Sequence, residues 1–449
     1  MGAGTATVVL SFDAWKGAKV NSTTHAVVVL PVKDGPKAEP TSPLLVATLV
    51  HPERKASVGQ VKYSDDGKRL FAAGYPSGVV QLFDLDTTKE LRRIDTPKGY
   101  RGSMEYAFLT PDWKTLYVTD ERKRKVVPVE IDGKKDHRIE YSGHVLAWDM
   151  TTGRPKDGFA PEKDSGASYA KMSPDGTKLL VVEFASALAS EQRKGRDVRT
   201  FAWDLTTGSK TKLGDSYLVP TFLPDGKTGL LVNTDYEAKT SVLKRIDLTT
   251  GKVLASRDTP DKGLNFSVNG VSPDGKLAAV SLGGKKGAAP TTLFVDPETL
   301  KDVATLTGEV DPEGYGWDSG SFSPDGKVFQ CVDGKGNLRL WDVAAKKVVR
   351  TIKHGERTWR RDFSPDGKWL AVAWMPKWDE EQDGARDPDP MDLPQPRVTL
   401  YDLADEKAKP VVLIAPDGFV GGLAFRPDGM QLAFGSAGGV HLFDLSKLK

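Results

Sequence analysis

The sequence predicts an all-β protein built from repeated units of four antiparallel strands. Three observations lead to this fold class. A turn motif recurs eight times along the 449 residues, a strand-ending motif also recurs eight times, and no stretch has convincing helical periodicity. A unit repeated in this way buries its faces against its neighbours, so the repeat predicts the whole architecture.

The turn motif has the sequence Ser-Pro-Asp-Gly-Lys, and complete copies stand at residues 272–276, 323–327 and 364–368. Successive copies lie 41 to 63 residues apart, which is the length of a four-stranded unit with insertions. The central aspartates of all eight copies are Asp66, Asp112, Asp175, Asp225, Asp274, Asp325, Asp366 and Asp428.

The residue types in this motif are those of a tight turn. Serine suits the first position of a type I turn, and proline presets the backbone dihedral φ of the second. Glycine accepts the positive φ that lets the chain rejoin a strand. Apolar runs such as residues 178–182 and 276–280 follow the turns, so each turn is expected to join two strands.

The second motif is an apolar or aromatic residue followed by aspartate, as in Trp148-Asp149, Trp203-Asp204 and Trp341-Asp342. Several copies continue into Thr-Thr-Gly and then into a run such as residues 252–256. This pattern indicates the end of a third strand, a turn and a fourth strand. The three tryptophans are expected to lie in the core.

These two motifs resemble those of the WD40-repeat family across nearly the whole chain, because the aromatic-Asp ending of the third strand is that family's namesake. The family's Gly-His pair is mostly missing, and His354 is its closest counterpart. The frequent Ser-Pro-Asp-Gly-Lys is more similar to bacterial WD40-like, TolB-like propellers. The resemblance implies a β-propeller of four-stranded blades. Eight blades are expected; seven is the alternative, with the second unit and its 63-residue interval as the irregular one.

The two ends of the chain are expected to close the ring. The last unit has only three strands, the third of them at residues 440–443, while residues 44–50 resemble a fourth strand without a unit of its own. Residues 44–449 are therefore interpreted as one propeller. Residues 1–43 are interpreted as an N-terminal extension with an extra hairpin, whose strands are expected at residues 7–12 and 25–32.

The composition excludes several classes of function. Sixty-three Lys and Arg nearly balance 61 Asp and Glu, and the net charge of +2 gives no long-range field for nucleic acid. The one cysteine, Cys331, cannot form an internal disulfide and is expected to be a buried thiol. No membrane span and no signal peptide are recognised. The expected location is the cytoplasm for a complete chain, or outside it if a signal was removed.

The repeated turns are expected on one face of the propeller, and the variable loops on the other. Three insertions fall on that loop face: a basic one at residues 122–125, a basic one at 185–199 and an acidic one at 375–397. Neither basic insertion has a nucleic-acid motif, and the acidic one lacks the ligand spacing of a calcium loop. Solvated loops are the simpler interpretation.

The links between units carry aromatic and arginine side chains, which are the usual anchors of protein interfaces. The alternative is that they pack between blades or plug the channel. The candidate partner-binding residues are Tyr100, Arg101, Tyr315, Trp317, Trp359, Arg360 and Arg361.

No catalytic, cofactor or metal residue is predicted. The six histidines show no metal-ligand spacing, and there is no Gly-x-Ser-x-Gly motif. The sequence therefore predicts a monomeric, non-catalytic scaffold that binds a protein through the loop face. The alternative is a lactonase-like or quinoprotein-like propeller that uses its central channel as an enzyme or small-ligand site.

Overall fold

The computed structural model describes part of the chain. Residue contacts divide the chain into two units, Met1–Ala38 and Glu39–Lys449, and the described residues lie within the second one. It describes residues 41–448 with gaps at 53–56, 76, 97–106, 120–122, 132–133, 189–197, 217–219, 236–237, 284–290, 309–319, 334, 354–357, 375–395 and 417–419. The predicted hairpin at residues 7–12 and 25–32 lies outside the described residues.

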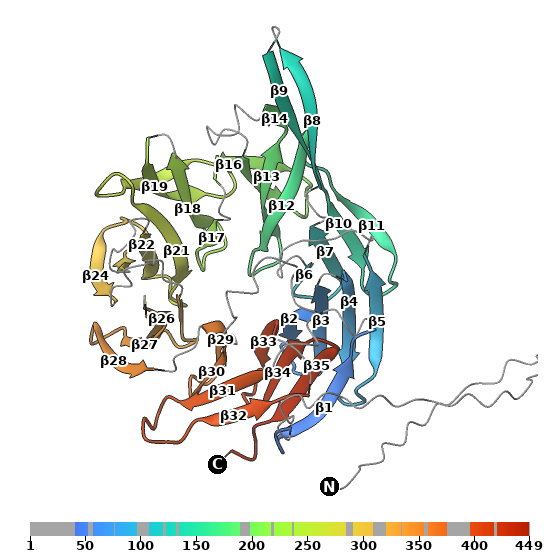
Figure 1. The fold of residues 1–449 in the computed structure, drawn as a ribbon, viewed down its shortest axis with the longest axis vertical. Helices are drawn as coiled ribbons and strands as arrows, with labels where there is room; N and C mark the ends of the chain where they lie inside the picture. Colours follow the sequence, from blue (N-terminus) through green and yellow to red (C-terminus); the bar gives the residue numbers. More distant parts are fainter. Residues whose placement is uncertain are drawn as a thin grey trace, which may run out of the picture. The chain divides into compact units, whose positions relative to one another are not determined.

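Every regular element of the described residues is a β-strand, as the sequence predicts (Figure 1). Eight sheets of four antiparallel strands and one sheet of three are formed within these residues. No helix in this part of the chain is long and apolar enough to cross a membrane. The expectation of eight blades rather than seven stays a prediction.

Each four-stranded sheet places its first strand at one edge and its fourth at the other, so the strands follow one another as in a meander. The first three sheets comprise β2 (Ser57–Tyr63), β3 (Arg69–Tyr75), β4 (Val79–Asp84), β5 (Glu90–Asp95); β6 (Ala107–Leu109), β7 (Thr115–Thr119), β10 (Val145–Asp149), β11 (Pro155–Phe159); and β12 (Ser165–Met172), β13 (Lys178–Ala185), β15 (Val198–Asp204), β16 (Lys210–Gly214).

The next four sheets repeat the same order. They comprise β17 (Thr221–Phe222), β18 (Thr228–Asp235), β19 (Thr240–Asp247), β20 (Val253–Asp258); β21 (Asn265–Val271), β22 (Ala278–Gly283), β23 (Thr291–Val295), β24 (Asp302–Thr307); β25 (Gly320–Phe322), β26 (Val328–Val332), β27 (Leu338–Asp342), β28 (Lys347–Ile352); and β29 (Thr358–Phe363), β30 (Trp369–Trp374), β31 (Arg397–Asp402), β32 (Val411–Ile414).

The last sheet combines the two ends of the described chain. It consists of β33 (Gly422–Phe425), β34 (Gln431–Ser436), β35 (Gly439–Asp444) and β1 (Leu45–Val50). Strand β1 pairs antiparallel with β35, with Leu45 opposite Phe443 and Val50 opposite Gly439. The predicted pairing of residues 44–50 with residues 440–443 is confirmed.

The core lies between the sheets. Every pair of consecutive sheets shares a cluster of buried apolar side chains, and the last sheet shares one with the first, where Leu70 and Phe83 meet Ala433 and Leu442. Trp148, Trp203 and Trp341 are buried in these clusters, as predicted, and so is the thiol of Cys331. This cyclic order of packing is the one expected of a propeller.

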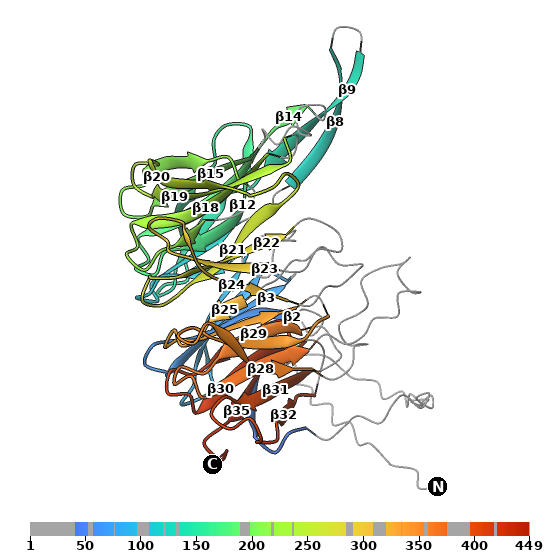
Figure 2. The ribbon, with the colours of Figure 1, turned by 90° about the vertical axis from the view of Figure 1, so that its left-hand side faces the viewer.

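The second repeat unit, which contains β6, β7, β10 and β11, also contains a hairpin that the sequence did not predict. Strands β8 (Lys123–Ile131) and β9 (Lys134–Ser142) lie between β7 and β10 in the chain and pair along their whole length (Figures 1 and 2). Strand β14 (Ala187–Leu188), from the second predicted insertion, pairs with β9. The hairpin accounts for the 63-residue interval between turn motifs, and the sheet around it keeps its four strands.

The repeated turns have the geometry that their residues predict. In the turn that begins at Ser272, the Gly275 amide donates to the Ser272 carbonyl at 2.8 Å, and Gly275 has a φ of +73°. The Ser272 hydroxyl donates to Asp274 at 2.6 Å, and this bond is the main cause that lowers the pKa of that carboxyl. Asp274 therefore stays ionised and holds the turn.

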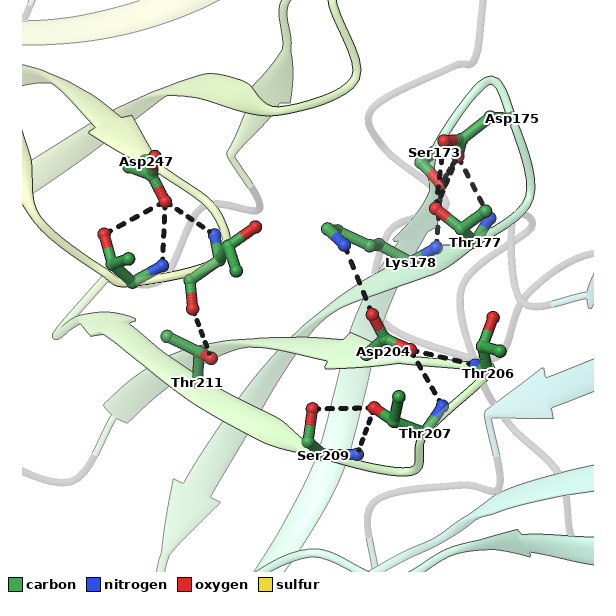
Figure 3. A network of polar contacts seen from close by, with 12 residues as sticks. Ser173, Asp175, Thr177, Lys178, Asp204, Thr206, Thr207, Ser209, Thr211 and Asp247 are labelled. Atoms are coloured by element: carbon green, nitrogen blue, oxygen red, sulfur yellow. Dashed lines mark hydrogen bonds and ion pairs between the residues drawn. The ribbon is translucent and has the colours of Figure 1, made fainter.

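The aspartate of the second motif caps the turn between the third and fourth strands. Asp204 Oδ1 accepts hydrogen bonds from the amides of Thr206 at 3.0 Å and Thr207 at 2.9 Å (Figure 3). The Thr207 amide lowers the pKa of Asp204. Asp247 makes the same contacts in the next sheet, so the motif marks a turn cap rather than a reactive group.

Candidate binding cavity

The candidate site is a cavity of about 850 Å³ lined by the first strands of five sheets. These strands are β2, β6, β12, β29 and β33, each at the edge of its own sheet. Strand β33 packs against both β2 and β29, so first strands of neighbouring sheets lie side by side. First strands that surround a common space are what a central channel requires.

One position recurs around this cavity. The residue two places before each turn motif lines it in all five strands. These residues are Lys62, Phe108, Lys171, Asp362 and Ala424. Prolines of four turn motifs, Pro111, Pro174, Pro365 and Pro427, line the cavity as well.

The lining is strongly cationic. Among the described residues, its charged side chains are Lys62, Lys171, Arg360 and Arg361, against the single carboxyl of Asp362. The two lysines are exposed, so water reaches the cavity. The arginines are half-buried and anchored: Arg360 Nε donates to the Gly421 carbonyl at 2.8 Å, and Arg361 donates to the Thr358 hydroxyl at 3.1 Å.

Asp362 differs from the aspartates of the turns. Its Oδ2 accepts a long hydrogen bond, 3.4 Å, from the amide of Phe425 on the neighbouring sheet. Burial raises the pKa of Asp362 to about 7, whereas the turn aspartates, rich in hydrogen bonds, have lowered pKa values. The charge of the cavity therefore changes near neutral pH.

The predicted partner-binding residues divide into two groups. Tyr100, Arg101, Tyr315 and Trp317 lie outside the described residues. Trp359, Arg360 and Arg361 are expected from the sequence in a link between units, but they lie in strand β29. The strand begins earlier than expected, and as a result both arginines line the cavity instead of projecting from a loop.

Sequence reasoning missed Lys62, Lys171 and Asp362 as candidates. Their signal is positional: each stands two residues before a turn motif, in a column that an alignment of the eight units displays. The equivalent residues in the other units are Phe108, Thr221, Gly270, Ser321 and Ala424. Only the fold shows that five residues of this column line one cavity.

The histidines that the structure describes serve packing or lie at the surface. His441 is buried, with Nε2 at 2.7 Å from the Ser436 hydroxyl and Nδ1 at 3.1 Å from that of Thr48. Burial lowers the pKa of His441 to about 4, so the ring is neutral at physiological pH. Among the described residues, no group of three or more His, Cys, Asp or Glu side chains is arranged to hold a metal ion.

Comparison with known proteins identifies the fold. No protein family matches the sequence, and no curated protein matches it either. Among solved structures, the C-terminal WD40 domain of Sif2 is similar, with a TM-score of 0.55 at 14% identity, over 89% of this chain and 97% of that domain. Together with the four-stranded sheets and their cyclic packing, this similarity shows that the chain is an all-β protein with the fold of a WD40-like β-propeller.

Proposed function

We propose that the chain is a non-catalytic scaffold that binds a protein partner, and that a segment of the partner enters the cavity between the first strands. The observation that carries the proposal is the position of Arg360 and Arg361, which β29 holds at a water-accessible cavity shared by five sheets. Arginine is enriched among the anchors of protein interfaces because its planar group makes several hydrogen bonds.

The candidate anchors outside the described residues are close in sequence to first strands, and this supports a binding site at the same end of these strands. Tyr100 and Arg101 stand shortly before β6, and β6 lines the cavity. Tyr315 and Trp317 stand shortly before β25, which is the equivalent first strand of another sheet. We propose that these residues contact the partner on the loop face while the cavity holds the inserted segment.

The proposal is tested by blocking the cavity. Random peptides displayed on phage are selected on the intact chain, and the enriched peptides are titrated against two variants. Ala424→Phe enlarges a side chain that lines the cavity and is only half-buried. Val412→Phe is the matched control, because Val412 is an exposed residue of the outer strand β32.

We expect enriched peptides to bind Ala424→Phe at least about tenfold more weakly than the unmodified chain, while Val412→Phe binds them normally. Melting temperatures measured in parallel show that both variants fold. Peptides that bind folded Ala424→Phe as tightly as the unmodified chain would place the binding surface elsewhere and overturn the proposal.

A second candidate function rests on the size of the cavity. A volume of about 850 Å³ lies within the range of small-molecule sites, so a small anionic ligand is the alternative occupant. Its test is a thermal-shift screen of small carboxylates and phosphates on the unmodified chain and on Ala424→Phe. A compound that raises the melting temperature of the unmodified chain but not that of Ala424→Phe favours this alternative.

A further inference from the structure

We infer that the cavity selects an acidic segment of the partner, and that Asp362 competes with this segment, so that proton uptake by the cavity strengthens binding. The inference rests on the proposed function, because it names the chemistry and the regulation of the same cavity. It starts from the imbalance of charge: four cationic side chains and one carboxyl line a space that a peptide can enter.

The two lysines are the exposed cations of the cavity. Lys62 and Lys171 come from different sheets, both are exposed, and both line the cavity at equivalent positions. No hydrogen bond or ion pair of Lys62 with another described residue is found, so its ammonium group is free to meet a carboxylate. A glutamate or aspartate side chain on an inserted segment would meet Lys62 without displacing a described protein group, and the charge of Lys171 adds to the attraction.

Asp362 is placed to oppose that contact. It occupies the same recurring position on β29 as the two lysines occupy on β2 and β12, and its side chain lines the same cavity. A second carboxylate in the cavity repels the ionised Asp362, whereas a protonated Asp362 is neutral and can donate a hydrogen bond.

No group of the strands packed beside Asp362 neutralises it. Strand β30, which pairs with β29, and strand β33, which supplies the Phe425 amide, contain no ionisable side chain. The charged or ionisable groups that share the cavity with Asp362 are Lys62, Tyr63 and Lys171 from β2 and β12, and Arg360 and Arg361 from its own strand.

The direction of the effect follows from the pKa of Asp362, which burial raises to about 7. Glutamates of a peptide keep their charge between about pH 6 and about pH 8, and so do lysine and arginine. Lowering the pH across this range therefore removes one negative charge from the cavity and none from the ligand. Binding of an acidic segment should strengthen as the pH falls, and this linkage is specific to Asp362.

The experiment measures binding of a rhodamine-labelled hexaglutamate peptide by fluorescence anisotropy, with hexaglutamine as the uncharged comparison. The full chain, Asp362→Asn and Lys62→Gln are titrated at about pH 6 and about pH 8. Asp95→Asn is the matched control, because it removes an exposed carboxyl from the outer strand β5.

We expect the unmodified chain and Asp95→Asn to bind hexaglutamate up to about tenfold more tightly at the lower pH, the ratio for a ligand that binds only the protonated site. Asp362→Asn should bind at both pH values as tightly as the unmodified chain binds at the lower one. Lys62→Gln should bind several-fold more weakly at both.

The outcomes separate this inference from the function it rests on. Selected peptides that need the open cavity, together with failure of hexaglutamate to bind better than hexaglutamine, would leave the scaffold standing and overturn the acidic preference. An unchanged pH dependence in Asp362→Asn would overturn the role of Asp362. Absence of any peptide sensitive to Ala424→Phe would instead contradict the proposed function itself.

Discussion

At the scale of single residues, a buried carboxylate pairs with a lysine from another strand of its sheet. Glu183 on β13 is 1% exposed, and its Oε1 lies 2.6 Å from Lys210 Nζ on β16. The same ammonium group lies 3.8 Å from the centre of the Phe201 ring. Burial raises the pKa of Glu183, and the contacts with Lys210 oppose this rise. The pair places an ionised group among apolar side chains that the sequence correctly marked as strand.

Replacing the lysine should therefore destabilise the fold in a pH-dependent way. In Lys210→Met, Glu183 keeps its burial and loses its cation, so the free energy of unfolding should fall by about 3 kcal/mol at about pH 8. A carboxyl whose pKa is raised in the folded state binds protons on folding, so stability is lost as the pH rises. The loss should be smaller at about pH 5 than at about pH 8, because a lower pH favours the neutral form of Glu183.

Urea unfolding at the two pH values measures this loss. The double variant Glu183→Gln/Lys210→Met is the control, because it removes both charges and should recover most of the stability at the higher pH. A loss of the same size at both pH values in the single variant would show that Lys210 acts through its apolar stem alone.

At the scale of elements, the turn motifs do more than join two strands. In several pairs of neighbouring sheets, the glycine of one turn lies against the proline or aspartate of the preceding turn: a Cβ at Gly176 would stand 2.2 Å from Pro111 Cδ, and one at Gly226 would stand 3.6 Å from Asp175. The turn at Gly67 meets Arg426 and Pro427 of the last sheet in the same way. The repeated turns therefore lie side by side, as the prediction of a common turn face required.

Two glycines with nearly the same φ distinguish the two roles of a turn, which are to reverse the chain and to contact the neighbouring turn. Gly176 has a φ of +69° and contacts the neighbouring turn, while Gly208 has a φ of +71° and nothing within 4 Å of the position of a Cβ. Gly208→Ala should cost about 1 kcal/mol, the strain of a positive φ alone. Gly176→Ala should cost more by at least about 1 kcal/mol, because Pro111 must also move.

Thermal unfolding of the two variants checks this difference. Equal losses of stability would mean that the neighbouring turn yields freely and that the contact between turns contributes nothing. A larger loss in Gly208→Ala would contradict the argument outright.

The elements that could be predicted were those with a repeated signature. Turn and third-strand motifs located most strands, because glycine, proline and aspartate have strong local preferences. The hairpin β8–β9 and the strand β14 have no such signature: Lys123–Lys125 was interpreted as part of a solvated basic loop, yet it starts a nine-residue strand. Pairing with a distant partner decided these segments, and a pattern within one segment does not record its partner.

At the scale of the whole molecule, closure was predictable and the cavity was not. The N-terminal strand lacked a unit and the last unit lacked a strand, and the structure pairs them. The cavity instead depends on side chains from sheets far apart in the sequence, such as Lys62 and Asp362. These side chains line one cavity because the sheets pack in a cyclic order, and no local motif encodes that order.

The paired ends make a prediction for truncated chains. Deletion of residues 1–50 removes β1 and leaves β35 as an unpaired edge, so the product should self-associate and melt at a lower temperature. Deletion of residues 1–38 is the control, because it removes the first unit and keeps β1. Light scattering and thermal unfolding compare the two truncated chains. If the chain without residues 1–50 stays monodisperse with an unchanged melting temperature, the role of β1 is contradicted.

The pairing of β1 with β35 also has a consequence for synthesis. The side chains of Thr48 and His441, which meet in this pair, are 393 residues apart in the chain. A ribosome releases β1 among the first segments and β35 among the last, so β1 has to wait in the nascent chain without its native partner. Intermediate sheets can form as they emerge, but the final sheet is assembled only after β35 has left the ribosome. Long-range pairing of this kind is a slow step of folding, and it cannot begin before β35 has been synthesised. A chain interrupted before β35 therefore leaves β1 without its partner strand, exposed to aggregation unless chaperones bind it.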